Sequence, residues 1–116
     1  MISRFIKSFS YAFQGLCYTF KTQGNFKFHS FAAFMAVGLG FYFKVNSLEW
    51  IVIILCIGLV LFAELVNTAI ETLVDLASPQ IHPLAKIAKD VAAASVLVLA
   101  IVATVIACFV FIPYIF

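Results

Sequence analysis

The chain has 116 residues, of which 66% are hydrophobic and only 10% are charged, and its net charge is +2. A soluble domain carries about a quarter charged residues, so this chain has too little polar surface to cover a water-soluble globule. The small net charge also argues against a nucleic-acid partner. The composition predicts an integral membrane protein.

Residues 1–22 are expected to form an amphipathic surface helix. Large apolar side chains recur there at helical spacing, at Phe5, Ile6, Phe9, Phe13, Leu16 and Phe20. Basic residues between them would face anionic headgroups at a membrane surface, although an ordinary core-packing helix would share this pattern. No long apolar run with a small-residue cleavage site follows Met1, so no signal peptide is expected.

Three later stretches are apolar enough to cross a bilayer, which takes about 20 residues of helix. No formal charge occurs between Lys27 and Lys44, between Glu49 and Glu64, or from Val91 onwards. We therefore expect an all-α membrane protein, a single domain over residues 1–116, with spans over about 26–44, 47–77 and 84–112.

The basic residues predict the orientation of these spans. Six of the seven lie before the first uncharged stretch or between the second and the third, and only Lys44 lies between the first and the second. Because cytoplasmic loops are enriched in Lys and Arg, the N-terminus is expected in the cytoplasm and the C-terminus outside.

A polar face interrupts the second span. Four side chains follow at three- and four-residue steps: Glu64, Asn67, Glu71 and Asp75. At about 100° per residue, all four share one helix face. Glu64 would lie about 25 Å along a helix that enters the bilayer at Ser47, near the edge of the hydrocarbon, with Glu71 and Asp75 further on in or near water. Such carboxylates usually mark a functional site, although a structural polar seam in a bundle has the same pattern.

The third span opens with a charged segment that contains Lys86, Lys89 and Asp90. Their three- and four-residue spacing places them on one helix face. Two lysines beside carboxylates at a helix N-terminus suit a phosphate or metal–phosphate group. Solvated lysines are the simpler alternative, but a face with several acids needs a cationic partner.

Two segments resemble the signature of the prokaryotic diacylglycerol kinase and undecaprenol kinase family. Residues 64–75 read Glu-x-x-Asn-Thr-Ala-Ile-Glu-x-x-x-Asp, and residues 88–94 read Ala-Lys-Asp-x-Ala-Ala-Ala. The resemblance extends to Arg4, Tyr11 and Gly15 and to the stretch Asn25-Phe-Lys-Phe-His29. It implies a homotrimeric enzyme of the bacterial inner membrane that uses ATP and Mg²⁺ to phosphorylate a membrane lipid alcohol.

The same resemblance implies roles for individual residues. Glu64 matches the catalytic base that accepts the proton of the lipid hydroxyl, and Glu71 matches a metal ligand. Asn25 and His29 are assigned to the lipid substrate. The implied ATP-binding residues are Arg4, Tyr11, Gln23, Asn67, Glu71, Gln80, Ile81, His82, Lys89 and Asp90. Phosphoryl transfer mainly needs positioning and charge neutralisation, which these residues could provide without a P-loop.

Gln23 departs from the family pattern, which often has a second metal-binding glutamate at this position. A glutamine oxygen can bind Mg²⁺ but brings no charge. Either the metal is held mainly by Glu71 and the ATP phosphates, or a neighbour such as Asp75 assists, or activity is impaired.

The substrate and even the class of function have alternatives. Three features resemble the branch that converts undecaprenol to undecaprenyl phosphate more than the branch that converts diacylglycerol to phosphatidic acid. They are Asn25 with His29, the segment Asn-Thr-Ala-Ile-Glu at 67–71, and the stretch from His82 to Lys86. A non-catalytic oligomer, such as an ion-conducting bundle, is the alternative from another class. A pore needs polar residues along a helix, yet Ile51–Ala63 is apolar apart from one glycine, which favours the enzyme.

Overall fold

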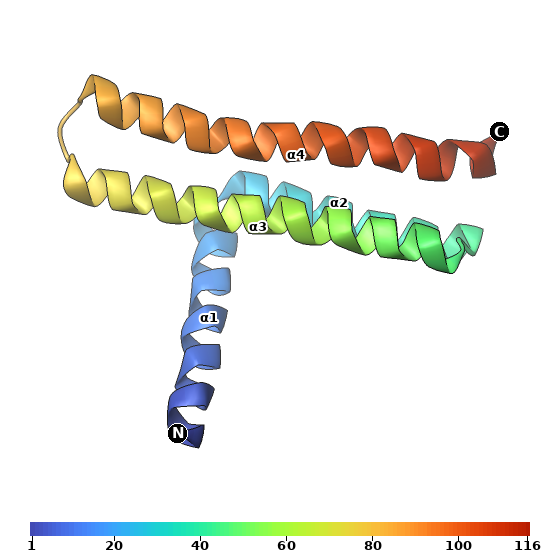
Figure 1. Cartoon of the computed structure of the whole chain (residues 1–116), viewed down its shortest axis with the longest axis horizontal. Helices are drawn as coiled ribbons and strands as arrows, with labels where there is room; N and C mark the ends of the chain where they lie inside the picture. Colours follow the sequence, from blue (N-terminus) through green and yellow to red (C-terminus); the bar gives the residue numbers. More distant parts are fainter.

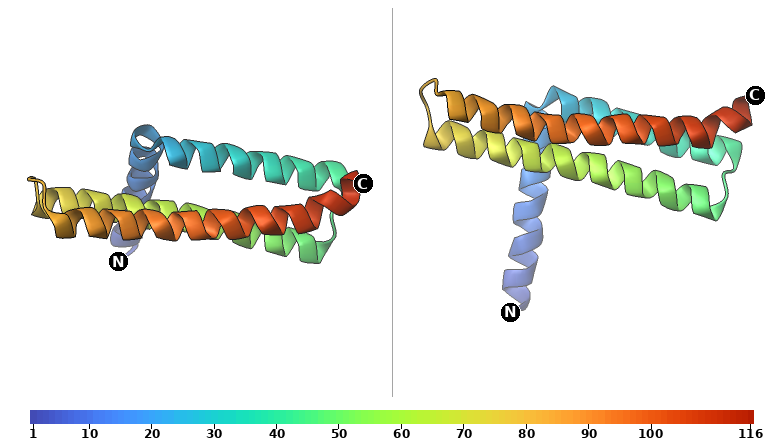
Figure 2. Two further views of the ribbon diagram at one scale, coloured as in Figure 1. Left: turned by 90° about the horizontal axis from the view of Figure 1, so that it is seen from above. Right: turned by 45° about the horizontal axis from the view of Figure 1, so that its top comes forward.

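The computed structural model describes all 116 residues, and they form four helices with short connections. These are α1 (Ile2–Thr22), α2 (Gly24–Phe43), α3 (Ser47–Ala77) and α4 (Pro83–Ile115). The last three run side by side, and α1 leaves the bundle at a steep angle (Figures 1 and 2). Each of α2, α3 and α4 is long and apolar enough to cross a membrane. The all-α fold is confirmed, with three helices that could span a membrane, and these helices end within three residues of the predicted span boundaries.

Short polar segments fix where the helices end. Gln23 has an extended backbone (φ −113°, ψ 109°), which separates α1 from α2 and lets the chain change direction. A capping box begins α3: Asn46 Oδ1 accepts the N–H of Glu49 at 2.9 Å, and Glu49 Oε1 accepts the N–H of Asn46 at 3.1 Å. At the start of α4, His82 Nδ1 accepts the N–H of Leu84 at 3.1 Å.

The helices differ in length, and this difference positions the polar residues. α3 has 31 residues and α4 has 33, so each is more than about 45 Å long, against about 30 Å of bilayer hydrocarbon. α2 has 20 residues and matches one bilayer thickness. The α3–α4 hairpin therefore extends past the start of α2 (Figure 1), and this overhang carries the charged residues that follow Glu64.

The main apolar core lies near the α2–α3 turn and is formed by Val45, Ile53, Val110 and Phe111. Only 14 of the 116 residues are buried. A single chain therefore leaves most of its apolar surface to be covered by lipid or by other chains.

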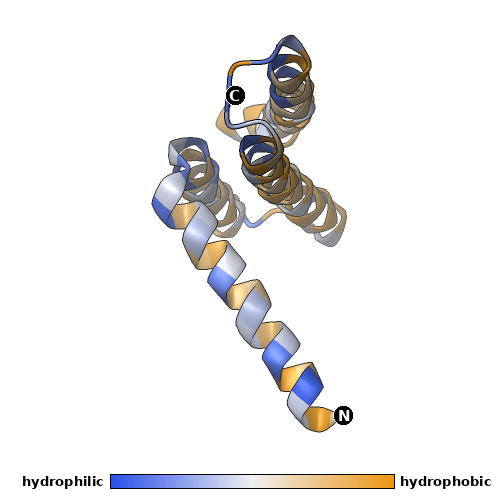
Figure 3. Cartoon of the chain, turned by 90° about the vertical axis from the view of Figure 1, so that its left-hand side faces the viewer, coloured by the Kyte–Doolittle hydropathy of each residue, from blue (hydrophilic) through white to orange (hydrophobic).

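Hydrophobic and hydrophilic residues alternate along α1 (Figure 3). Its side chains Phe5, Phe9 and Phe13 are each more than 60% exposed. With the bundle along the membrane normal, a helix at this angle would lie in the plane of the interface (Figure 1). The surface position of α1 and the orientation of the termini stay predictions.

Candidate active site

The polar face of α3 is buried at its centre. Glu64, Asn67 and Thr68 have 2%, 8% and 4% of their surface exposed. Thr68 Oγ1 donates to the backbone carbonyl of Glu64 at 2.9 Å, so this hydroxyl is satisfied within the helix. Buried polar groups are costly without hydrogen bonds, and the side chains of Glu64 and Asn67 therefore depend on partners further away.

Glu64 finds its partner on another helix. Its Oε1 lies 2.7 Å from Nδ1 of His29 on α2, the only side-chain hydrogen bond that joins α2 to α3. The predicted lipid-site histidine thus contacts the predicted base. The two residues are 35 positions apart in the sequence, and nothing in the local pattern of either helix could have revealed this contact.

One turn further along α3, Asn67 and Glu71 are linked. Asn67 Nδ2 donates to Glu71 Oε1 across a long 3.4 Å contact. Asn67 Oδ1 is buried and has no hydrogen-bond partner. Buried carbonyl oxygens are usually paired, so this acceptor is available to a ligand.

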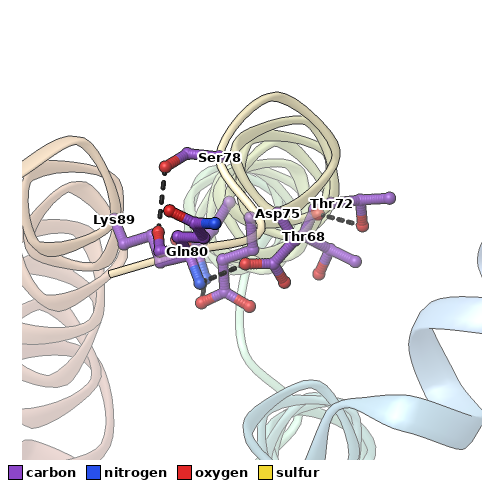
Figure 4. A network of polar contacts seen from close by, with 8 residues as sticks. Thr68, Thr72, Asp75, Ser78, Gln80 and Lys89 are labelled. Atoms are coloured by element: carbon purple, nitrogen blue, oxygen red, sulfur yellow. Dashed lines mark hydrogen bonds and ion pairs between the residues drawn. The ribbon is translucent and has the colours of Figure 1, made fainter. Parts of the chain in front are cut away.

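The overhang of α3 and α4 carries two ion pairs. Lys89 on α4 pairs with Asp75 on α3 (Figure 4). Lys86 pairs with Asp90 at 2.6 Å within α4, and both of these side chains are more than 60% exposed. Lys89 is therefore the cationic partner that the acidic face of α3 was expected to need.

The α3–α4 loop lies beside these charges and closes a shallow pocket of about 350 Å³. Ser78 Oγ donates to the backbone carbonyl of Gln80 at 3.0 Å, which fixes the turn (Figure 4). The pocket brings together five of the residues predicted to bind ATP: Gln80, Ile81, His82, Lys89 and Asp90. Asp75 and Ser78 also line it and were not among the predicted ATP-binding residues. Asp75 could have been identified as a pocket residue because it lies on the same helix face as Glu64. No pattern in the sequence pointed to Ser78.

Other predicted site residues are not brought together within one chain. Arg4 and Tyr11 lie on the exposed α1, which points away from the α3–α4 loop (Figure 1). Gln23 stands at the corner between α1 and α2, and Asn25 is in the first turn of α2. No hydrogen bond joins any of these four side chains to the polar face of α3.

The oxygen donors fit a magnesium ion that is shared with phosphate. The chain forms no cluster of three or more His, Cys, Asp or Glu side chains that could hold a metal by itself. Glu71 and the unpaired Asn67 Oδ1 do offer two oxygens one turn apart. Mg²⁺ commonly binds through one or two carboxylates together with waters and substrate phosphates, so such a small donor set fits it.

An apolar groove of about 330 Å³ runs between α2, α3 and α4. Sixteen residues line it, and the only polar ones are His29 and Thr104. His29 therefore connects the groove with the buried carboxylate of Glu64. The arrangement can hold an apolar molecule in the membrane beside a proton acceptor, with a charged pocket further along the same hairpin.

A sequence profile described as prokaryotic diacylglycerol kinase matches residues 10–111. The match includes α2, the polar face of α3 and the charged start of α4. The chain belongs to the prokaryotic diacylglycerol kinase family. It is a membrane lipid kinase, which uses ATP to phosphorylate a lipid, and this family membership decides against the non-catalytic bundle.

Individual relatives of this kinase carry two different names. An undecaprenol kinase of Bacillus subtilis is 44% identical over 112 residues, which cover 97% of this chain and 91% of the relative. A diacylglycerol kinase of Haemophilus influenzae is 35% identical over 97 residues, covering 84% and 82%. A diacylglycerol kinase of Escherichia coli is 31% identical over 106 residues, covering 91% and 87%.

Proposed function

We propose that this kinase transfers the γ-phosphate of ATP to undecaprenol, producing undecaprenyl phosphate in the bacterial inner membrane. The observation that carries the proposal is an apolar groove whose wall residue His29 is bonded to the buried Glu64. The 44% identity to an undecaprenol kinase over nearly the whole chain supports the choice of lipid.

The polarity of the groove also favours undecaprenol over diacylglycerol. Undecaprenol is a long hydrocarbon with one hydroxyl, whereas diacylglycerol carries two ester groups beside its hydroxyl. Apart from His29 and Thr104, the groove offers no side chain that could bond to an ester oxygen. Desolvating polar groups without replacing their hydrogen bonds lowers affinity, so the ester-bearing lipid should bind less well.

Glu64 is the proposed general base. As the lipid oxygen attacks the γ-phosphorus, the hydroxyl proton passes to the Glu64 carboxylate. Its burial at 2% exposure keeps bulk water away from this carboxylate.

The charged overhang is the proposed phosphate and nucleotide site. Lys89 and Asp90, with the loop residues Gln80, Ile81 and His82, line the pocket that would receive ATP. Glu71, Asn67 and Gln23 would hold Mg²⁺, which when bound neutralises phosphate charge. Glu71 follows Glu64 by about 10 Å along α3, so one helix face would connect the lipid hydroxyl with the metal–phosphate group. Arg4 and Tyr11 of α1 are proposed to contribute to the same nucleotide site.

We further propose a cytoplasmic N-terminus, an external C-terminus and a homotrimer. Lys86 and Lys89 lie at one end of the bundle and Lys44 at the other, and the more basic end should face the cytoplasm. The apolar surface that one chain leaves exposed supports packing against further copies within the bilayer.

Transfer of labelled phosphate from ATP to undecaprenol and to diacylglycerol, each offered in mixed micelles, tests the proposal. We expect kcat/KM for undecaprenol to be at least roughly ten-fold higher. Glu64→Gln should lower transfer by about 10²- to 10⁴-fold, the usual contribution of a general base. Glu49→Gln is the matched control, because Glu49 is an acid at the opposite end of α3.

Each outcome of this experiment is informative. Preference for diacylglycerol would overturn the choice of lipid and leave the base in place. A Glu64→Gln enzyme that stays as active as Glu49→Gln would overturn the proposed base for either lipid.

A further inference from the structure

We infer that His29 is a positioning residue that holds the Glu64 carboxylate in place as the base, rather than a residue that binds the lipid. This inference rests on the proposed role of Glu64 as general base. His29 Nδ1 lies 2.7 Å from Glu64 Oε1, which is a short distance for a nitrogen–oxygen hydrogen bond. The contact joins two helices and is nearly closed to solvent, with 18% of the His29 side chain and 2% of the Glu64 side chain exposed.

No other residue of the chain can take over this task. The Glu64 carboxylate has no other hydrogen-bond partner, since Thr68 bonds only to the backbone carbonyl of Glu64. An ionised carboxylate buried without a donor would be strongly disfavoured. The hydrogen bond to His29 satisfies one carboxylate oxygen of Glu64 and holds this side chain in one orientation.

The chemistry of the two groups fixes the direction of the bond. An ionised carboxylate only accepts hydrogen bonds, so Nδ1 of His29 must carry the hydrogen. This bond occupies Oε1 and leaves Oε2 without a partner in the chain. Oε2 is then the atom that receives the proton of the lipid hydroxyl, and His29 keeps the carboxylate from rotating away from it.

If His29 bound the lipid directly, it would use the other nitrogen of its imidazole ring. His29 forms part of the groove wall, and with Nδ1 engaged by Glu64 only Nε2 would remain for a lipid oxygen. The two roles therefore use opposite nitrogens of the imidazole, and side-chain amides can separate them. The amide nitrogen of Asn occupies nearly the position of Nδ1, whereas that of Gln reaches the position of Nε2.

The test compares His29→Asn, His29→Gln and His29→Leu, using whichever of the two lipids the unaltered kinase phosphorylates. We expect His29→Leu to lower kcat by about 10- to 100-fold, the effect of losing a hydrogen bond to a charged group. The KM for the lipid should change by less than about three-fold, because the lost bond positions the base and does not hold the substrate. His29→Asn should restore kcat to within about three-fold of the unaltered enzyme, and His29→Gln should not.

Several results would overturn the inference. These are recovery by Gln but not by Asn, a loss confined to the lipid KM, failure of both amides, and full activity of His29→Leu. The double variant Glu64→Gln/His29→Leu should be no slower than Glu64→Gln alone, because a positioning residue has no effect once its target is gone. Normal folding of each variant is checked by gel filtration in detergent. Failure of Glu64→Gln to reduce activity would refute the proposed role of Glu64 as base, whereas active His29 variants beside an inactive Glu64→Gln would refute only the role of His29.

Discussion

The two ends of the bundle satisfy their polar groups to different degrees. At the α2–α3 turn, Asn46 and Glu49 cap each other, and the Tyr114 hydroxyl from the end of α4 donates to the same Glu49 carboxylate. At the opposite end, the carboxylate of Glu64 has a single partner, and the buried Oδ1 of Asn67 has none.

This difference assigns stability to the α2–α3 end of the helices and function to the polar end. A buried polar group without a partner costs about 1–3 kcal/mol, so the polar end is less stable than the same helices could be. The polar atoms that lack partners can instead bind a lipid hydroxyl, a metal ion or a phosphate. Substitutions at the α2–α3 turn should therefore act on stability, and substitutions at the polar end should act on turnover.

At the polar end, the two lysines of α4 should differ in their contribution to ATP binding. Lys89→Gln should raise the KM for ATP by about 10- to 100-fold, since it removes a charge from the nucleotide pocket and leaves Asp75 without its partner. Lys86 also lines the pocket, but its side chain is 78% exposed against 39% for Lys89. Lys86→Gln should therefore raise this KM by less than about three-fold. Steady-state kinetics at saturating lipid measure both values. Equal effects of the two variants would mean that the pairing across helices has no special role in binding ATP.

At the α2–α3 end, substitution of a glycine tests whether stability changes without a change in activity. A Cβ at Gly40 would lie 2.6 Å from the Trp50 ring, whereas a Cβ at Gly38 meets nothing within 4 Å. Gly40→Ala should lower the free energy of unfolding by about 1–3 kcal/mol through overpacking, with normal activity per folded molecule. Gly38→Ala is the control and should be neutral or stabilising by up to about 1 kcal/mol. Unfolding titrations in detergent measure the stability of both variants. A loss of activity in folded Gly40→Ala would contradict the assignment of stability to one end and function to the other.

Local patterns were sufficient to predict the helices and the polar face. Asn46 before an apolar run and Pro79 after a charged one delimit α3, and the steps from Glu64 to Asp75 place four polar groups on one face whatever the helix packs against. The pairing of helices is not local. The partner of Glu64 is 35 residues away and that of Asp75 is 14 residues away, and both depend on how the helices are aligned.

The direction of α1 could not be predicted from the sequence either. It depends on the extended backbone of a single residue, Gln23, for which the surrounding pattern sets no preference. For this reason the sequence could assign Arg4 and Tyr11 to the nucleotide site only through resemblance, and one chain does not bring them to the α3–α4 loop (Figure 1).

The smallest expected effect concerns the corner at Gln23. If this side chain reaches the metal, Gln23→Glu adds a carboxylate to a site that otherwise offers Glu71 and a neutral amide oxygen. The Mg²⁺ concentration for half-maximal activity should then fall by about three- to ten-fold, because hard cations prefer charged oxygen ligands. The rate at saturating Mg²⁺ should stay within about two-fold, since the metal merely becomes easier to bind.

Gln14→Glu provides the matched control, because it makes the same change on the exposed surface of α1, the helix that ends just before Gln23. An equal shift in both variants would reflect general attraction of Mg²⁺ to added negative charge. No shift in Gln23→Glu would place Gln23 away from the metal and leave Glu71, Asn67 and the ATP phosphates to hold it. A shift specific to Gln23 would show that the polar end has spare capacity for one more ligand.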